Sequence, residues 1–290
     1  MAEVDCLHPG EHILGESPVW SVAEEALYWV DIQAPAIHRL RPASGEIKTW
    51  TLPEQVGSIA LRSRGGLVAA TKTGFHFFDP ATGRLRQIVD PERHMPENRF
   101  NDGRCDRAGR FWAGTMHESS HEPVGALYCL EPNLTVRTVQ TGISIPNSLA
   151  WSPDDRVMYF ADSPRRRIWA YDFDVAQGVI WNRRVFVDAA DHPGVPDGST
   201  VDAEGCLWNA EHGGSRVCRY TPAGRLDRVL DLPVTQPTCC VFGGPRLETL
   251  YITTAREGLG PEQLAEQPLA GAVFAVQPGV SGLPEPGFAG

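Results

Sequence analysis

The stretch PNSLAWSPDDRVMYFADSPRRRIWAYDFDVAQGVIWNRRVFVD, residues 146–188, contains four short runs in which apolar and polar residues alternate. Turn-forming residues such as Pro-Asp-Asp separate the runs. Alternation with a period of two is typical of half-buried β-strands, and short polar turns between such strands join them as antiparallel hairpins. The stretch therefore predicts a unit of four antiparallel strands.

The same template recurs along the whole chain. When the six copies are aligned, the openings of their first strands lie 40 to 50 residues apart, which is the size of a four-stranded propeller blade. We therefore predict an all-β fold, a six-bladed β-propeller, with residues 1–290 as one domain. Residues 4–7 are expected to pair with the last blade and close the ring, and the segment near Pro261 is expected to form one or two helical turns. The aligned openings are Glu16, Gly57, Asn101, Asn147, Asp197 and Pro237.

Composition limits the classes of partner. The chain has 42% hydrophobic and 21% charged residues, as globular proteins do, with a formal net charge of −10 and a pI near 5.4. An acidic chain is a poor ligand for nucleic acid. No signal peptide and no apolar run long enough to span a membrane is found, and the seven cysteines lie mostly in apolar strand-like runs. We expect a cytoplasmic protein with reduced cysteines, monomeric or weakly oligomeric, with no nucleic-acid or membrane partner.

The aligned openings predict a metal site. First strands of propeller blades line the central channel, so these six positions should converge at one mouth. Four of them are oxygen donors, Glu16, Asn101, Asn147 and Asp197, and such a set suits a hard divalent cation such as Ca²⁺, Mg²⁺ or Mn²⁺ better than Zn²⁺. The alternative is that these residues cap a solvated channel and bond to one another.

Several other patterns are weaker. Asp202 and Glu204 follow Asp197 closely but fall in the first hairpin turn, where turn geometry favours such residues. The stretch HESSH at residues 117–121 matches a zinc-protease pattern only literally, because that motif requires a helix. No Gly-x-Ser-x-Gly elbow or phosphate-binding loop is present. By contrast, Arg99, Asn101 and Asp102 place a cation, an amide and a carboxylate together, which suits a polyhydroxylated substrate.

Long, ordered stretches of the chain resemble the senescence marker protein, gluconolactonase and regucalcin-like family of six-bladed propellers. The resemblance implies a divalent metal on Glu16, Asn147 and Asp197, and substrate contacts from Arg99, Asn101 and Glu118. The loop at residues 117–124, which carries Glu118, is short for the family. The matching stretches are LGESPVW, NRFNDGRCDRAGRFWAGTM, IPNSLAWSPDD, VPDGSTVDAEGCLW, TCCVFGGPRLETLYITTAREGL and QPLAGAVFAV.

The resemblance also implies an activity, the hydrolysis of a small-molecule sugar lactone to the aldonic acid. A divalent metal, whether Ca, Zn, Mn, Mg or Fe, would polarise the lactone carbonyl and lower the pKa of bound water. Asp197 or Asp102 would then take the proton of the water. The alternative is a calcium-binding regulatory protein without dominant lactonase activity. An interaction propeller of the WD type is disfavoured, because no Gly-His to Trp-Asp spacing recurs.

Overall fold

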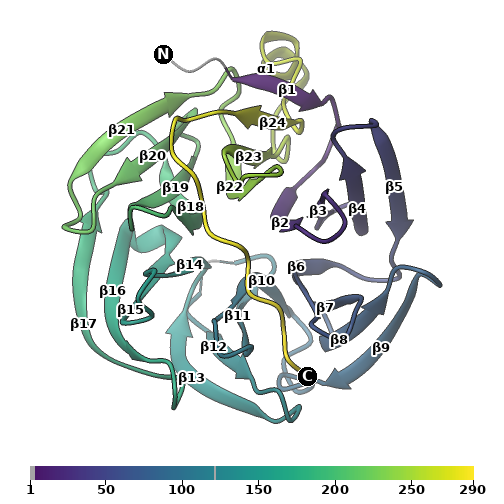
Figure 1. The fold of residues 1–290 in the computed structure, drawn as a ribbon, viewed down its shortest axis with the longest axis vertical. Helices are drawn as coiled ribbons and strands as arrows, with labels where there is room; N and C mark the ends of the chain where they lie inside the picture. Colours follow the sequence, from purple (N-terminus) through teal and green to yellow (C-terminus); the bar gives the residue numbers. More distant parts are fainter. Residues whose placement is uncertain (1–3, 121) are drawn as a thin grey trace.

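The computed structural model describes residues 4–120 and 122–290. Within them, 24 strands form six four-stranded antiparallel sheets that are arranged as the blades of a ring (Figure 1). The predicted six-bladed β-propeller is therefore confirmed. In the first five blades the chain runs from the innermost strand outwards, and in the last blade β22, β23 and β24 do the same before β1 adds the outermost strand. The innermost strand of each blade borders the central channel.

The strands fall into four concentric sets. The innermost are β2 (Gly15–Ser21), β6 (Val56–Leu61), β10 (Asn98–Cys105), β14 (Pro146–Trp151), β18 (Val195–Val201) and β22 (Pro237–Gly243). The second set is β3 (Ala26–Asp31), β7 (Leu67–Thr71), β11 (Phe111–His117), β15 (Val157–Asp162), β19 (Leu207–His212) and β23 (Thr249–Thr254). The third set is β4 (Ala36–Arg41), β8 (Gly74–Asp79), β12 (Gly125–Leu130), β16 (Arg167–Asp174), β20 (Arg216–Tyr220) and β24 (Val273–Val276). The outermost set is β5 (Glu46–Thr51), β9 (Arg84–Val89), β13 (Val136–Ile143), β17 (Val179–Asp188), β21 (Leu226–Asp231) and β1 (Asp5–His8).

Among the described residues, helical structure is confined to two short segments. The α-helix α1 (Pro261–Glu266) lies where the sequence predicts it, and the 3₁₀ turn η1 (Ser163–Arg165) follows β15. No helix in the described part of the chain has the length and apolar character needed to cross a membrane.

Burial follows distance from the channel. Strands β2 and β3 are buried along their whole length, whereas β5 exposes five of its six residues. The core lies between neighbouring blades, where aromatic side chains from two sheets meet. Trp112 of β11 and Trp151 of β14, for example, have ring centroids 5.8 Å apart in an edge-to-face arrangement. Six of the seven cysteines are buried and all seven are free thiols, as expected.

The N-terminal strand closes the ring. Strand β1 pairs with β24 in antiparallel fashion, with Asp5 opposite Ala275 and Cys6 opposite Phe274, so the last blade is built from both ends of the chain. This confirms the pairing expected for residues 4–7. The closure covers the outer edge of β24 and ties the first blade to the last by main-chain hydrogen bonds.

Residues 281–290, here called the C-terminal strap, cross the ring over one end of the channel (yellow in Figure 1). The strap pairs with the turn of the fifth blade at Asp202 and Gly282, and with the second blade at Arg62 and Phe288. The side chain of Phe288 is fully buried among residues of the second and third blades. The strap therefore joins blades that are far apart in the sequence.

Candidate metal and substrate site

The six innermost strands share one local irregularity. Each innermost strand has a β-bulge near its start, where it contains one residue more than the paired segment of the second strand. In β2, β10, β14 and β18 three residues of the inner strand advance against two of its partner. In β6 and β22 two residues advance against one. Such a bulge bends a strand and changes the direction of its side chains. The residues at or beside the bulges include Glu16, Asn101, Asn147 and Asp197, so the predicted convergence at one mouth of the channel is found.

Two of the six aligned positions carry no donor, and Gly57 has a packing reason for this. A Cβ atom at Gly57 would lie 2.3 Å from the main-chain oxygen of Phe100 on β10. Only glycine allows β6 to approach β10 this closely. The donors therefore come from four blades, with β2, β14 and β18 supplying the three residues of the predicted metal set.

The acids at this mouth are buried together. Glu16, Asp102 and Asp197 are each less than 8% exposed. Burial and the charge of Asp102 raise the pKa of Glu16 to about 8, and burial and the charge of Glu16 raise the pKa of Asp197 well above its usual range. Burial also raises the pKa of Asp102. Carboxylates that repel one another in a desolvated site are stabilised by a cation, so the donor set fits a hard divalent metal.

Asn147 is oriented by its neighbours. Its Nδ2 donates to Ser163 Oγ at 2.8 Å, and Ser163 Oγ in turn donates to the main-chain oxygen of Pro196, next to Asp197, at 2.7 Å. Its Oδ1 accepts a hydrogen bond of 3.2 Å from Asn101 Nδ2. These bonds fix the orientation of the Asn147 amide, with its oxygen toward the amide of Asn101. Over residues 4–120 and 122–290, no group of three or more His, Cys, Asp or Glu side chains has metal-binding geometry.

The predicted substrate-binding residues border this cluster. Arg99 on β10 donates from Nη1 to Asn101 Oδ1 at 2.9 Å and to the main-chain oxygen of Phe100 at 3.0 Å. Asp102 Oδ2 accepts a hydrogen bond of 2.9 Å from the main-chain amide of Leu149 on the next blade. Glu118 follows β11, at the same mouth, and its charge acts on Arg99. His121, the second histidine of HESSH, lies outside the described residues.

Three residues that contact the predicted site residues were not predicted from the sequence. Lys72 and Gln55 of the second blade both bond to Glu118, and Ser163 orients Asn147. Lys72, Glu118 and Ser163 occupy equivalent turns, each following the second strand of its blade. If the repeats had also been aligned at the turns that follow the second strands, these three residues would have been expected at the same mouth.

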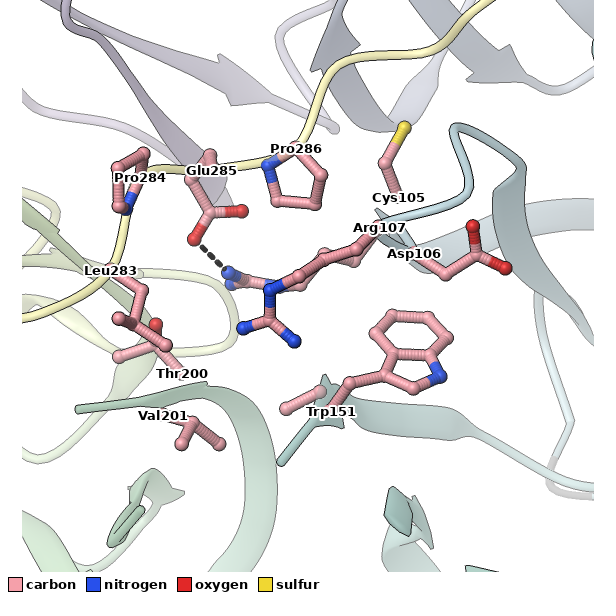
Figure 2. A pocket seen from close by; sticks show the side chains of 12 residues that line it. Cys105, Asp106, Arg107, Trp151, Thr200, Val201, Leu283, Pro284, Glu285 and Pro286 are labelled. Carbon is pink, nitrogen blue, oxygen red and sulfur yellow. Dashed lines mark hydrogen bonds and ion pairs between the residues drawn. The ribbon is translucent and has the colours of Figure 1, made fainter. Parts of the chain in front are cut away.

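The C-terminal strap crosses the other end of the channel, and Leu283, Pro284, Glu285 and Pro286 of the strap line a pocket there (Figure 2). Glu285 of the strap accepts a hydrogen bond of 2.5 Å from Arg104 Nη1, beside the rings of Pro284 and Pro286. Burial raises the pKa of Glu16 and of Asp102, and the positive charge of Arg104 offsets part of this rise.

Asp202 and Glu204, which the sequence assigned to a turn, lie away from the site in the structure. Asp202 is fully buried and accepts hydrogen bonds from the amides of Glu204 and Cys206 and from Trp208 Nε1. The carboxylate of Glu204 is exposed and pairs with Arg219 at 2.6 Å. Both residues lie in the hairpin turn between β18 and β19, at the end of the channel that the strap covers.

The ring of six blades with buried oxygen donors at one mouth defines a class of six-bladed propellers with an acidic, polar site in the channel. Comparison with known proteins identifies the chain more closely: residues 14–256 match the family model described as SMP-30/gluconolactonase/LRE-like region. The chain belongs to this family, and the resemblance seen in its sequence is confirmed.

Three relatives illustrate the similarity. The chain is 39% identical to a 6-deoxy-6-sulfogluconolactonase of Pseudomonas putida over 98% of both chains, and 37% identical to regucalcin of Homo sapiens over 99% of both. Among solved structures, a calcium-binding protein, regucalcin, from Agrobacterium tumefaciens superimposes with a TM-score of 0.96 at 33% identity, covering 99% of this chain and 97% of that one.

Proposed function

We propose that this protein hydrolyses a sugar lactone to its aldonic acid with a divalent metal held by Glu16, Asn147 and Asp197. The observation that carries the proposal is the buried pair of Glu16 and Asp197, whose raised pKa values leave a site that a cation would stabilise. When bound there, the metal would polarise the lactone carbonyl and lower the pKa of a water molecule. The lactonase names within the family support the reaction class.

The side chains around the metal set would position the lactone and move the proton. Asp197 and Asp102 are the two candidate bases for the attacking water, a role worth roughly 10²–10⁴-fold in rate. The Leu149 amide donates to Asp102 Oδ2 and holds this carboxylate in place. Arg99, Asn101 and Glu118 would orient the hydroxyl groups of the sugar, since their polar atoms border the same mouth.

The substrate class includes lactones with a charged substituent. The Pseudomonas putida relative carries the name 6-deoxy-6-sulfogluconolactonase, and it is 39% identical over almost the whole chain. We therefore include the sulfonated gluconolactone among the candidates, together with neutral 1,4- and 1,5-aldonolactones.

A calcium-binding regulatory role is the second candidate. Its support is the all-oxygen donor set, which suits Ca²⁺, and the description of the Agrobacterium tumefaciens structure as a calcium-binding protein. Tight Ca²⁺ binding without turnover of any lactone would favour this role.

The test is a lactone panel assayed by acid release after chelation and re-addition of Ca²⁺, Mn²⁺, Zn²⁺, Fe²⁺ or Mg²⁺, with spontaneous hydrolysis subtracted. The proposal expects activity to disappear on chelation and to return with at least one metal. Full activity in protein shown by elemental analysis to be metal-free would refute the metal-dependent reaction.

A further inference from the structure

The rim of the channel mouth carries an ion pair between the second and third blades. Lys72, in the turn between β7 and β8, places Nζ 2.5 Å from Glu118 Oε2. Gln55 Nε2 donates to the other oxygen, Glu118 Oε1, at 2.6 Å. Both oxygens of Glu118 are therefore engaged, and the hydrogen bond from Lys72 is the main cause that lowers the pKa of Glu118.

Beside this pair, Arg99 is a buried cation without a direct counter-ion. Arg99 is only 5% exposed, and its Nε has no hydrogen-bond partner among the described residues. Within the residues that the structure describes, no carboxylate oxygen lies within 4.0 Å of its guanidinium. Burying a charge without a partner is costly, so the site gains stability when an anion reaches Arg99.

Four carboxylates act on Arg99 from a distance, and exposed Glu257, which follows β23, has the largest effect. The other three, Glu118, Glu16 and Asp197, have further partners or roles. Glu118 is held by Lys72, and Glu16 and Asp197 are the residues that we propose as metal ligands. Lys72 therefore prevents Glu118 from serving as the counter-ion of Arg99. The ammonium group of Lys72 has three N–H donors, of which Glu118 uses one, and about one third of the side chain is exposed at the rim.

We propose that Lys72 is a specificity-determining residue, which selects lactones that carry an anionic substituent such as a sulfonate, carboxylate or phosphate. The substituent would lie between the free donors of Lys72 and the guanidinium of Arg99, while the lactone ring faces the acids. This inference rests on the proposed lactonase function and deepens it. A charge-assisted hydrogen bond to such a group would favour the charged substrate roughly ten- to hundredfold.

The experiment compares two lactones that differ at one position, D-gluconolactone and 6-deoxy-6-sulfogluconolactone. The values of kcat and KM are measured for the wild type, Lys72→Gln, Lys72→Arg and the control Lys48→Gln. Lys48 is the only other lysine in the chain and lies on β5 at the outside of the first blade. All four proteins are checked for folding by thermal unfolding.

We expect the wild type to prefer the sulfonated lactone. In Lys72→Gln its KM should rise roughly ten- to hundredfold more than the KM of the neutral lactone, and Lys72→Arg should restore most of the preference. Lys48→Gln should retain the wild-type ratio. Added salt should raise the KM of the sulfonated lactone selectively, because it screens the attraction between charges.

Three results separate the inference from the function beneath it. Equal changes for both lactones in Lys72→Gln, or equal wild-type kcat/KM values without selective salt dependence, would overturn the inference and leave the lactonase intact. No turnover of any lactone by the metal-loaded wild type would instead overturn the proposed function. If Lys72→Gln fails to fold, Lys72→Arg and the salt dependence of the wild type decide the question.

Discussion

At the scale of single residues, the site depends on buried acids whose ionised forms the fold destabilises. Glu16 lies on β2 of the first blade and Asp197 on β18 of the fifth blade, and both carboxylates are buried. The charge of Asp102 raises the pKa of Glu16 further, and the charge of Glu16 does the same for Asp197. An acid kept in such a place without a cation resists ionisation. A divalent metal would remove that conflict, and the first two predictions concern its ligands.

Asp197→Asn and Glu16→Gln should each abolish metal retention and lower kcat/KM by at least a hundredfold, because each removes one of only two proposed charged ligands. Metal content is measured by elemental analysis and turnover with the lactone panel. Asp188→Asn is the matched control, since Asp188 is exposed and pairs with Arg167 on the surface. Wild-type turnover in either metal-free variant would contradict the assignment.

Ser163→Ala should weaken metal binding roughly ten- to hundredfold, the usual effect of removing a group that orients a ligand. The variant loses the hydroxyl that holds Asn147 and bonds to the main chain of Pro196. Titration of the metal-free protein with Mn²⁺ or Ca²⁺ measures the change. Ser44→Ala, in an exposed turn of the first blade, should bind as the wild type does, and unchanged affinity in Ser163→Ala would show that the hydroxyl has no orienting role.

At the scale of the hairpin, the first turn of two blades contains a buried aspartate that accepts several hydrogen bonds. Asp202 accepts bonds from two turn amides and from Trp208 Nε1, and Asp106 does the same with the amides of Ala108 and Arg110 and with Trp112 Nε1. The shared sequence is Asp-x-x-Gly-x-x-Trp. The acid thus anchors the turn and a core tryptophan together, which explains its place in the repeat without any catalytic role.

Asp202→Asn should destabilise the fold by about 1–3 kcal/mol, because it removes one of the three carboxylates paired with the buried Arg219 and weakens the set of hydrogen bonds that the Asp202 carboxylate accepts. Urea unfolding measures the loss. The kcat of the folded fraction should stay near the wild-type value, since the turn lies at the far end of the channel. Glu204→Gln, on an exposed side chain of the same turn, should change stability by less than about 0.5 kcal/mol; a loss as large as that of Asp202→Asn would contradict the distinction.

At the scale of the whole molecule, two segments hold the ring closed. Strand β1 completes the last blade, and the C-terminal strap joins the second, third, fifth and sixth blades by main-chain hydrogen bonds. Near the first closure, His8, His12 and His38 lie close together, and the rings of His12 and His38 are 4.6 Å apart. Histidines packed this way are stable only while most of them are neutral.

This cluster predicts a loss of stability in acid. Burial, and after it the charge of His12, lowers the pKa of His38 to about 3. The unfolded chain has a His pKa near 6.5 and therefore binds more protons than the folded chain between these values. Stability should fall as the pH falls from 6.5 towards 3, by up to about 1.4 kcal/mol per pH unit for this group.

The check is the free energy of unfolding of the wild type, His38→Asn and His94→Asn as a function of pH. His38→Asn should show a shallower slope below pH 6.5, whereas the exposed His94 should not affect the slope. Identical slopes for all three proteins would show that the cluster does not govern acid sensitivity.

The sequence by itself determined the six blades, the closing strand and the meeting of Glu16, Asn101, Asn147 and Asp197, because a repeat with a fixed period places equivalent residues at equivalent points of a ring. Only the tertiary structure decided what surrounds them. The pair of Lys72 and Glu118 joins turns of the second and third blades, and the bond from Ser163 to Asn147 joins a turn of the fourth blade to its innermost strand. The ion pair of Arg104 and Glu285 joins the third blade to the C-terminal strap. The residue types in these turns and in the strap do not repeat. Periodicity determines strand register, but contacts between such turns depend on where each side chain reaches once the ring has closed.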